Sequence, residues 1–212
     1  FYRGVSTRKV QEHFKAFYPH NSSHKSIYKW IVKYSKMISK FTDGLKLNVG
    51  KELQVDEMQY SRRKSHNRKG VAVNWFIDSI DCETRFMVAS EFSNSRNAEK
   101  LKQVIRKAKK KTGEQIKIVT TDGLNAYPYL IKKIFGYNNI FRKHNVEHRK
   151  RVGIKGEGFN IMVERLHNNI RQRTKIFRGF HGSVKSANAI MKGYEIYYNF
   201  ITKHQQIKCC PY

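Results

Sequence analysis

The sequence predicts an α/β fold, with a mixed central sheet flanked by helices and a small all-helical module in front of it. Short runs rich in Val, Ile, Phe and Met recur between turn residues after about residue 52, as expected for consecutive strands. A helix-like stretch separates the third run from a fourth, and a helix between two strands favours a parallel arrangement in one sheet. The 212 residues suffice for one such domain with a small appendage.

The first part of the chain, residues 1–41, is predicted to be the helical module. Ser6 can cap a first helix, and residues 19–23 interrupt it with turn chemistry before a second helix begins. A short helix, a break and a second helix fit a helix-turn-helix, whose second helix enters the major groove of DNA. Lys25 and Lys29 would then contact DNA. A helical hairpin with no role in DNA binding fits the same spacing equally well.

Residues 42–51 contain turn residues, including Gly44 and Gly50, and are predicted to form a linker. The main domain is predicted to span residues 52–203, with a tail at 204–212. Its first three strands are predicted to be consecutive and antiparallel, at residues 52–61, 71–80 and 85–92.

A strongly basic turn joins the first two of these strands. Its candidate DNA-contacting residues are Arg62, Arg63, Lys64, Arg68 and Lys69. A hairpin tip of this kind is either solvated surface or a clamp for phosphate groups. The positive charge of the whole chain favours the clamp.

Helix and strand alternate in the second half of the main domain. A helix over residues 97–112 is predicted to end at Gly113, where a left-handed cap costs little. A fourth strand follows and closes at Asp122, and a helix covers about residues 125–135. A helix through Glu164 and a last helix complete the chain.

A long basic segment, residues 136–158, lies between these helices. It is broken by glycines and contains Arg149, Lys150 and Arg151 as candidate DNA contacts. A long segment without regular structure inside a compact domain is usually functional or mobile. We therefore predict that residues 142–158 become ordered only when DNA is bound.

The charge of the chain restricts its partners. Its 43 Lys and Arg residues against 16 Asp and Glu give a formal net charge of +27. Such a surplus opposes compact folding unless a polyanion is nearby, so nucleic acid is the expected partner. The chain is 39% hydrophobic and 13% aromatic, which excludes a disordered basic tail. A ribosomal or chromatin protein would carry a similar charge.

The three cysteines, Cys82, Cys209 and Cys210, do not have metal-ligand spacing and predict a reducing, intracellular setting. No apolar run approaches the roughly 20 residues that span a bilayer. The chain begins at Phe1, so we expect a processed protein or a fragment.

Three acids stand out in this basic chain. Asp56 lies in the first strand, Asp122 ends the fourth, and Glu164 lies on a helix. If the two strands are neighbours, both aspartates emerge at the same edge of the sheet, and the helix can add the glutamate. Carboxylate oxygens are the ligands that Mg²⁺ prefers, and two such ions support phosphodiester cleavage and transfer.

Ordinary structural roles compete with this interpretation. Acids at strand ends are often turn or capping residues, and Asp78 and Asp81 meet the same description. Glu57 is expected on the opposite face of its strand, at the surface. Glu164 alone fits a salt bridge to a neighbouring basic residue.

Two further residues follow Glu164 on its helix. His167 is three residues and Arg171 seven residues further on, so all three are predicted to share a face. A guanidinium and an imidazole beside a metal site would engage a DNA phosphate. An ordinary stabilising pair within the helix is the alternative.

The chain resembles the DDE transposases of bacterial and archaeal insertion sequences, in particular the insertion-sequence-six group. The matching segments are Val55-Asp56-Glu57, residues 75–81, Thr120-Thr121-Asp122-Gly123-Leu124-Asn125-Ala126-Tyr127-Pro128, Val163-Glu164-Arg165-Leu166-His167 through Arg171, and Phe177-Arg178-Gly179-Phe180. The front segment, residues 3–30, is similar to the helix-turn-helix of that group. The basic hairpin between Asp56 and Trp75 is longer than the family's pattern.

The resemblance implies an RNase H-like catalytic core with Asp56, Asp122 and Glu164 as metal ligands and Arg171 as the family's basic residue after the glutamate. It implies Mg²⁺ or Mn²⁺ as the cofactor, as two ions. The implied partners are the terminal repeats of the element, target DNA and a second copy of the chain. The implied location is the prokaryotic cytoplasm, in association with the nucleoid. Arg178 joins the expected DNA contacts.

Two other functions fit the same residues. A decayed or domesticated transposase would bind DNA without cutting it. An RNase H-like nuclease would cut without terminal repeats. Strong salt dependence of DNA binding would be common to the first of these and to an active transposase.

Overall fold

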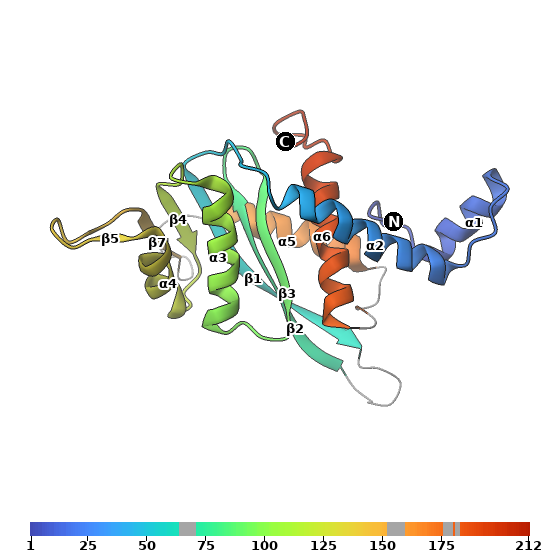
Figure 1. The fold of residues 1–212 in the computed structure, drawn as a ribbon, viewed down its shortest axis with the longest axis horizontal. Helices are drawn as coiled ribbons and strands as arrows, with labels where there is room; N and C mark the ends of the chain where they lie inside the picture. Colours follow the sequence, from blue (N-terminus) through green and yellow to red (C-terminus); the bar gives the residue numbers. More distant parts are fainter. Residues whose placement is uncertain (64–70, 152–159, 176–179, 181–182) are drawn as a thin grey trace.

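The computed structural model describes residues 1–63, 71–151, 160–175, 180 and 183–212, with only the backbone described at 61–63 and 71–72. The elements are α1 (Thr7–Phe17), α2 (His24–Thr42), β1 (Glu52–Arg63), β2 (Val71–Asp81), β3 (Met87–Ser93), α3 (Ala98–Thr112), β4 (Ile118–Thr121), α4 (Ala126–Phe135), β5 (Tyr137–Asn138), β6 (Lys143–His144), β7 (Glu147–Lys150), α5 (Ile161–Thr174) and α6 (Val184–Phe200). Figure 1 shows helices packed around a twisted central sheet.

The central sheet has five strands in the order β3-β2-β1-β4-β7. The pairs β1–β2 and β2–β3 are antiparallel, whereas β4 runs parallel to β1 and β7 parallel to β4. The predicted mixed sheet of five strands with flanking helices is therefore confirmed. The strand β4 lies directly beside β1, as the placement of the two aspartates requires.

The fifth strand corrects the expectation for the basic segment at residues 136–158. Part of that segment forms the small hairpin β5–β6, and β7 pairs with β4 from Ile118↔Glu147 to Thr121↔Lys150. Residues 143–144 and 147–150 are thus strands, where the sequence predicted a segment without regular structure. Residues 152–159 lie outside the described part of the chain.

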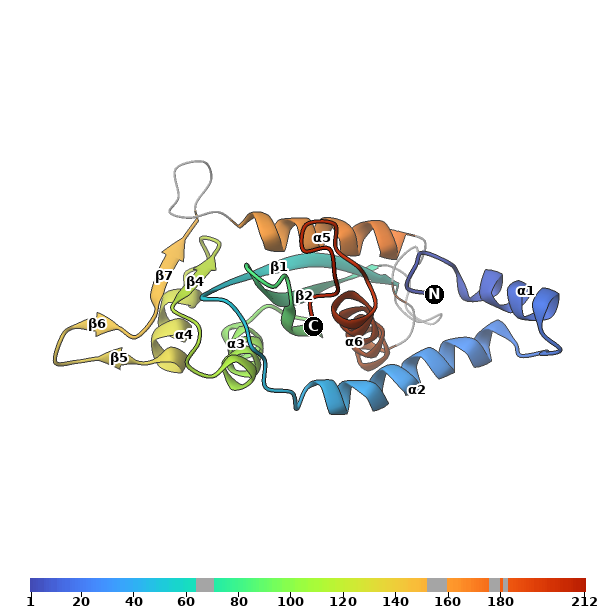
Figure 2. The ribbon, with the colours of Figure 1, turned by 90° about the horizontal axis from the view of Figure 1, so that it is seen from above.

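The two faces of β1 contribute to two different cores. Leu53 and Val55 pack with α3 and α4, whereas Met58 packs with α5 and α6. Figure 2 shows α5 lying along β1, opposite α3 and α4. Because side chains alternate along a strand, Asp56 leaves β1 on the α5 face and Glu57 on the α3 and α4 face.

The N-terminal helices pack against the main domain. The Tyr2 hydroxyl donates a hydrogen bond to the Ile190 carbonyl of α6 at 3.0 Å and is 3.1 Å from the Ser35 hydroxyl of α2. A Cβ atom at Gly193 would collide with Tyr2 and Ser35, so this close approach requires glycine. The two helices predicted for residues 1–41 are present, and they share an interior with α6 across the expected linker.

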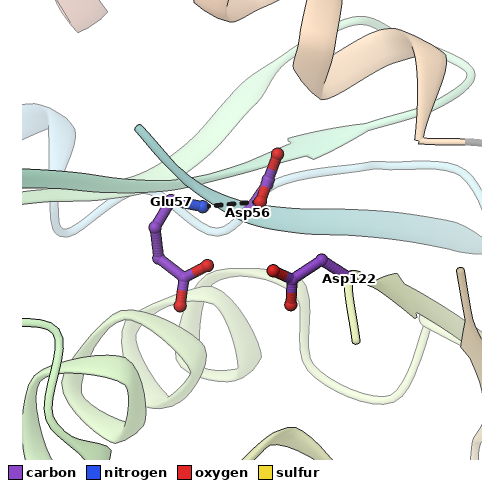
Figure 3. A group of neighbouring side chains, drawn as sticks. All are labelled: Asp56, Glu57 and Asp122. Atoms are coloured by element: carbon purple, nitrogen blue, oxygen red, sulfur yellow. Dashed lines mark hydrogen bonds between the residues drawn. The ribbon is translucent and has the colours of Figure 1, made fainter. Parts of the chain in front are cut away.

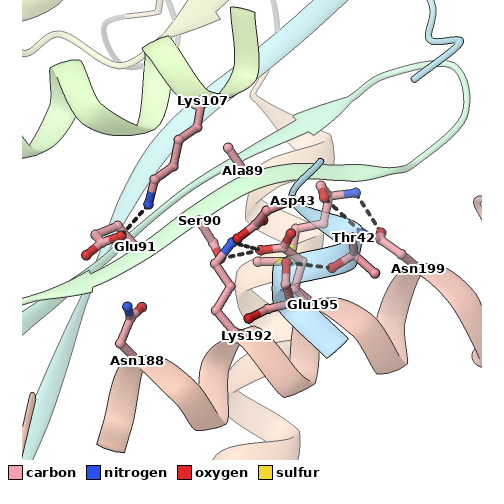
Figure 4. Close-up of polar contacts among 12 residues, drawn as sticks. Thr42, Asp43, Ala89, Ser90, Glu91, Lys107, Asn188, Lys192, Glu195 and Asn199 are labelled. Carbon is pink, nitrogen blue, oxygen red and sulfur yellow. Dashed lines mark hydrogen bonds and ion pairs between the residues drawn. The ribbon is translucent and has the colours of Figure 1, made fainter. Parts of the chain in front are cut away.

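A buried ion cluster joins α2, α3 and α6 (Figure 4). The Lys192 ammonium lies 2.7 Å from Glu195 and 3.3 Å from Asp43, which follows α2 directly. Lys111 of α3 lies 3.2 Å from Asp43 and 3.4 Å from Glu195. Ser90 of β3 donates a hydrogen bond of 2.6 Å to Glu195. The acids of this cluster are therefore neutralised by lysines.

Among the described residues, no helix combines the length and the apolar character that crossing a membrane requires.

Candidate active site

The site is built where β4 stops beside β1. The last pair of the parallel register is Val55↔Thr121, so Asp56 and Asp122 are the next residues on the two strands. β1 continues past this point to Arg63, so Asp56 lies inside β1 at the level where β4 ends. Asp122 begins a turn there, because its Oδ1 accepts a hydrogen bond of 3.0 Å from the Leu124 amide. The strand ending thus brings the two expected aspartates together.

Glu57 is the third acid of this group. One carboxylate oxygen from each of Asp56, Glu57 and Asp122 lies within 4.8 Å of the others. Figure 3 shows the Glu57 and Asp122 carboxylates directed toward one another. The Glu57 amide donates a hydrogen bond of 2.8 Å to Asp56 Oδ1. Glu57 does leave the opposite face of β1, as the alternation predicts, but it is half-buried beside Asp122 and not a surface residue.

Burial and mutual repulsion shift the acids of the site toward their neutral forms. Burial raises the pKa of Asp56 to about 6, with further increases from Asp78 and Asp122 and opposing effects from His167 and the Glu57 amide. Burial, followed by the charges of Asp122 and Asp56, raises the pKa of Glu57 to about 7. A nearby cation would favour the charged forms of these groups.

Helix α5 is held over the site by a strand residue. Gln54 Oε1 accepts hydrogen bonds from the amides of Met162 at 2.9 Å and Val163 at 3.2 Å. Two free amides at the start of α5 are satisfied in this way. Glu164 lies in this first turn and is exposed. It stands outside the group formed by Asp56, Glu57 and Asp122.

His167 lies one turn further along α5 and points into the protein. It is only 3% exposed, with Nε2 at 2.8 Å from Asp78 Oδ1 and Nδ1 at 3.7 Å from Asp56 Oδ2. Burial alone would lower the pKa of His167, but the Asp78 and Asp56 carboxylates raise it above its ordinary value. This placement differs from the expected contact with a DNA phosphate, because a buried imidazole cannot reach DNA in this conformation.

Arg171 is exposed on the same helix. Its guanidinium lies 3.5 Å from the Asn168 side-chain oxygen, a weak contact that leaves it accessible. Glu164 and Arg171 are therefore both exposed, whereas His167 faces the aspartates. The helix separates the three residues that the sequence placed on one face.

The other predicted DNA contacts are scattered over the molecule. Lys25 and Lys29 are exposed on α2. Arg149 of β7 is held by Glu147, with Nε at 2.7 Å from Oε1. Lys150 and Arg151 are half-buried at the end of β7. Of the remaining residues, Arg62 and Arg63 are described by backbone alone, and Lys64, Arg68, Lys69 and Arg178 lie outside the described residues.

Lys25 and Lys29 begin a longer row of cations on α2. The row, here called the lysine row, consists of Lys25, Lys29, Lys33, Lys36 and Lys40. All five are exposed, and α2 contains no acid. Lys29, Lys33, Lys36 and Lys40 line a shallow groove of about 530 Å³ beside the start of α6. The row is an extended positive surface on the outside of the protein.

Sequence reasoning missed three members of the site. Glu57 lies on the face of β1 that the sequence predicted. Its proximity to Asp122 could not be predicted, because it depends on β4 ending at Thr121, beside Val55. Gln54 carries no charge and gave no signal. Asp78 was noted only as a strand-end acid, although it is fully buried and paired with His167.

The acids fit a hard divalent cation. Mg²⁺ takes oxygen ligands at about 2.1 Å, so oxygens on opposite sides of the ion lie about 4.2 Å apart. The oxygens of Asp56, Glu57 and Asp122 lie within 4.8 Å of one another, so movements of less than about 1 Å would bring them to this geometry. Among the described residues, no Lys or Arg lies within ion-pair distance of these acids.

Two transposase complexes are among the similar solved structures. A pre-cleavage Mos1 transpososome matches with 9% identity, covering 89% of this chain and 71% of that chain with a TM-score of 0.33. The Mos1 strand transfer complex matches with 10% identity, covering 89% and 70% with a TM-score of 0.34. No curated protein sequence matches the chain.

A protein-family comparison gives the identification. A family model described as a DDE domain matches residues 73–205, more than half of the chain. The matched range contains Asp122 and Glu164 and begins after Asp56. The chain therefore belongs to the DDE transposase family and is a DDE-type DNA transposase with an RNase H-like core.

Proposed function

We propose that this transposase binds the terminal inverted repeats of an insertion sequence and catalyses metal-dependent strand cleavage and transfer with Asp56, Asp122 and Glu164 as its acidic residues. The observation that carries the proposal is that Asp56, inside β1, lies beside Asp122, which directly follows the neighbouring parallel strand β4, with one carboxylate oxygen of each within 4.8 Å of the other. In a chain with a net charge of +27, acids that have no lysine or arginine ion pair among the described residues are suited to a metal ion.

The chain's own residues set up the chemistry. Bound Mg²⁺ or Mn²⁺, as two ions, would activate a water or a 3′-hydroxyl and stabilise the leaving oxygen. Asp56 is held by the Glu57 amide and His167, and Asp122 by the Leu124 amide. His167 acts as a positioning residue that is itself anchored by Asp78. Arg171, exposed beyond His167, would bind a phosphate next to the scissile bond.

Glu164 completes the proposed set from α5. Its helix is fixed to β1 two residues before Asp56, through Gln54. A long glutamate in the first turn of this helix is suited to join the aspartates when DNA and metal enter the site. We place Glu164 in the catalytic set on the strength of the family motif and of this anchoring.

DNA would bind through positive surfaces outside the acidic site. The lysine row extends the predicted contacts Lys25 and Lys29 along α2. At a rise of 1.5 Å per residue, Lys25 and Lys40, fifteen positions apart on α2, are about 22 Å from each other along the helix axis, enough to follow several phosphates of a duplex. Arg149, Lys150, Arg151 and Arg171 would add contacts nearer the site. We also infer assembly as a dimer or larger complex on paired ends, in the prokaryotic cytoplasm.

Replacing Asp122 by Asn is the decisive experiment. The amide keeps the shape of the side chain but is a poor Mg²⁺ ligand, so cleavage of terminal-repeat DNA should fall by at least about a thousandfold. Glu99→Gln on the exposed side of α3 is the matched control and should cleave as the wild type does.

Two outcomes would contradict the proposal. Cleavage by Asp122→Asn at the wild-type rate would show that the catalytic site lies elsewhere. Wild-type cleavage that is equally fast on DNA without terminal repeats would indicate a general nuclease. DNA binding alone cannot distinguish an active transposase from a decayed one, because both are expected to bind DNA with strong salt dependence.

A further inference from the structure

We propose that Glu57, together with Asp56 and Asp122, is a ligand of the divalent cation that the site holds before DNA binds. This inference rests on the proposed function, since it concerns the same metal site. It differs from the expected acidic set, in which the third member is Glu164. The structure assigns the two glutamates to different states of the site.

The first support is the geometry around the end of β4. Asp122 is the first residue beyond β4, and none of the described strands pairs with β1 on this side beyond Val55. Asp122 is therefore accessible from both faces of β1. Asp56 approaches it from the α5 face and Glu57 from the α4 face, and Figure 3 shows Glu57 and Asp122 directed toward one another.

The second support is the poor satisfaction of the polar groups on the α4 side. Both Glu57 carboxylate oxygens are buried, and within the described part of the chain neither has a hydrogen bond of good geometry. The Tyr127 hydroxyl lies beside Glu57 on a side chain with no exposed surface and favours the charged form of this carboxylate, although the two groups do not form a hydrogen bond of good geometry. Buried polar groups without partners are costly. A cation between Glu57 and Asp122 would satisfy the carboxylate.

The third support is the position of Glu164. It lies in the first turn of α5, is exposed, and stands outside the group of three acids. The hydrogen bonds that the amides of Met162 and Val163 donate to Gln54 Oε1 fix this end of the helix. In the protein without DNA, metal binding should therefore depend on Glu57 and not on Glu164.

Mn²⁺ binding to the full chain without DNA separates the two glutamates. Calorimetric titration should show affinity for Mn²⁺ lowered at least about tenfold by Glu57→Gln, as expected for loss of a carboxylate ligand. Glu164→Gln should bind Mn²⁺ within about twofold of the wild type, although it should not cleave DNA. Glu57→Asp keeps a carboxylate and should bind more tightly than Glu57→Gln.

The remaining outcomes discriminate between the two proposals. If Asp122→Asn weakens Mn²⁺ binding but Glu57→Gln does not, this inference is wrong and the metal site stands. If neither variant changes Mn²⁺ affinity, the metal site itself is wrong. Thermal unfolding of each variant without metal checks the fold, and a Glu57→Gln variant that melts as the wild type does and binds Mn²⁺ equally well overturns the inference.

Discussion

Two groups of acids in this basic protein have opposite electrostatic surroundings. In the cluster between α2, α3 and α6, Asp43 and Glu195 are in contact with Lys111 and Lys192. Burial opposes ionisation of Asp43, yet the two lysines lower its pKa below the ordinary value. Burial likewise opposes the charge of Lys192, but Glu195 and Asp43 raise its pKa. The cluster therefore carries its own neutralising charges.

Within the described part of the chain, Asp56, Glu57 and Asp122 have no lysine or arginine partner of this kind. Burial raises the pKa values of Asp56 and Glu57 to about 6 and about 7. The only ion-pair partner of these acids among the described residues is His167. Although the chain has 43 Lys and Arg residues, none of those in the described part forms an ion pair with these acids. The comparison indicates that the first group holds helices together, whereas the second is kept available for a metal ion.

Giving the site its own cation should abolish this difference. In Glu57→Lys, the ammonium would neutralise Asp56 and Asp122 as Lys192 neutralises Glu195. We expect cleavage of terminal-repeat DNA to fall at least about a thousandfold, because a metal supplies several kcal/mol of transition-state stabilisation. The melting temperature without metal should stay the same or rise. Glu99→Lys makes the same charge change on exposed α3, and its activity should be unchanged. Cleavage by Glu57→Lys at the wild-type rate would show that the acids at the end of β4 do not need to be free of a neutralising cation.

Removing a cation from the other group should cost stability instead. Lys192→Met leaves the buried Glu195 with the Ser90 hydrogen bond and, as its remaining cation among the described residues, Lys111 at 3.4 Å. Breaking a buried pair by removing one partner costs about 3 kcal/mol or more of unfolding free energy. Urea denaturation measures this loss, and adding Glu195→Gln should recover part of it. A Lys192→Met variant as stable as the wild type would show that the cluster does not hold the helices together.

The pH dependence of stability should have opposite signs in the two groups. Because the pKa values of Asp56 and Glu57 are raised to about 6 and about 7, the folded state binds more protons than the unfolded chain from about pH 4 upward. Their contribution to stability is complete below about pH 4 and is lost as the pH rises through 6 and 7. For Asp43, whose pKa is lowered, the contribution is present above about pH 4 and is lost as the pH falls through the folded pKa.

Urea unfolding in the presence of a chelator can resolve these signs. Glu57→Gln should flatten the wild-type profile between about pH 5 and 8, because it removes the carboxyl group whose pKa is raised by burial and then by the charges of Asp122 and Asp56. Asp43→Asn should flatten it only below about pH 4. If the free energy of unfolding of Glu57→Gln ran parallel to that of the wild type between pH 5 and 8, the raised pKa of Glu57 would be contradicted.

The arrangement of β1 and β4 could be predicted because strand periodicity and an intervening helix both appear in the sequence. The strand β7 could not, since its residues Glu147 to Lys150 include no apolar side chain. Its position at the edge of the sheet, where charged residues are common, explains the missing signal. Its register is set by backbone pairing with β4, which leaves no pattern in the side chains.

Part of the site was likewise hidden from the sequence. Asp56 and Asp122 could be paired because each ends or follows an apolar run. The orientation of α5 could not be derived, because His167 lies one turn after Glu164 but on the side of Val163 and Ile170, which enter the core. Helical spacing gives relative positions on a helix, and only packing decides which of them face inward.

The lysine row on α2 is a positive surface that lies away from the acidic site. Changing Lys33, Lys36 and Lys40 together to Gln should weaken terminal-repeat binding several-fold at moderate salt and reduce the slope of log K against log salt by up to about 0.9 per lost phosphate contact. Cleavage at saturating DNA should stay normal, because these residues lie away from the acids. Lys102→Gln with Lys109→Gln removes lysines of α3 that are already paired with Glu99 and Glu114, and should change the slope less. This change in slope is the smallest of the effects expected here. If both sets of variants lowered the slope equally, the lysine row would contribute only general positive charge and would not be a distinct DNA-binding surface.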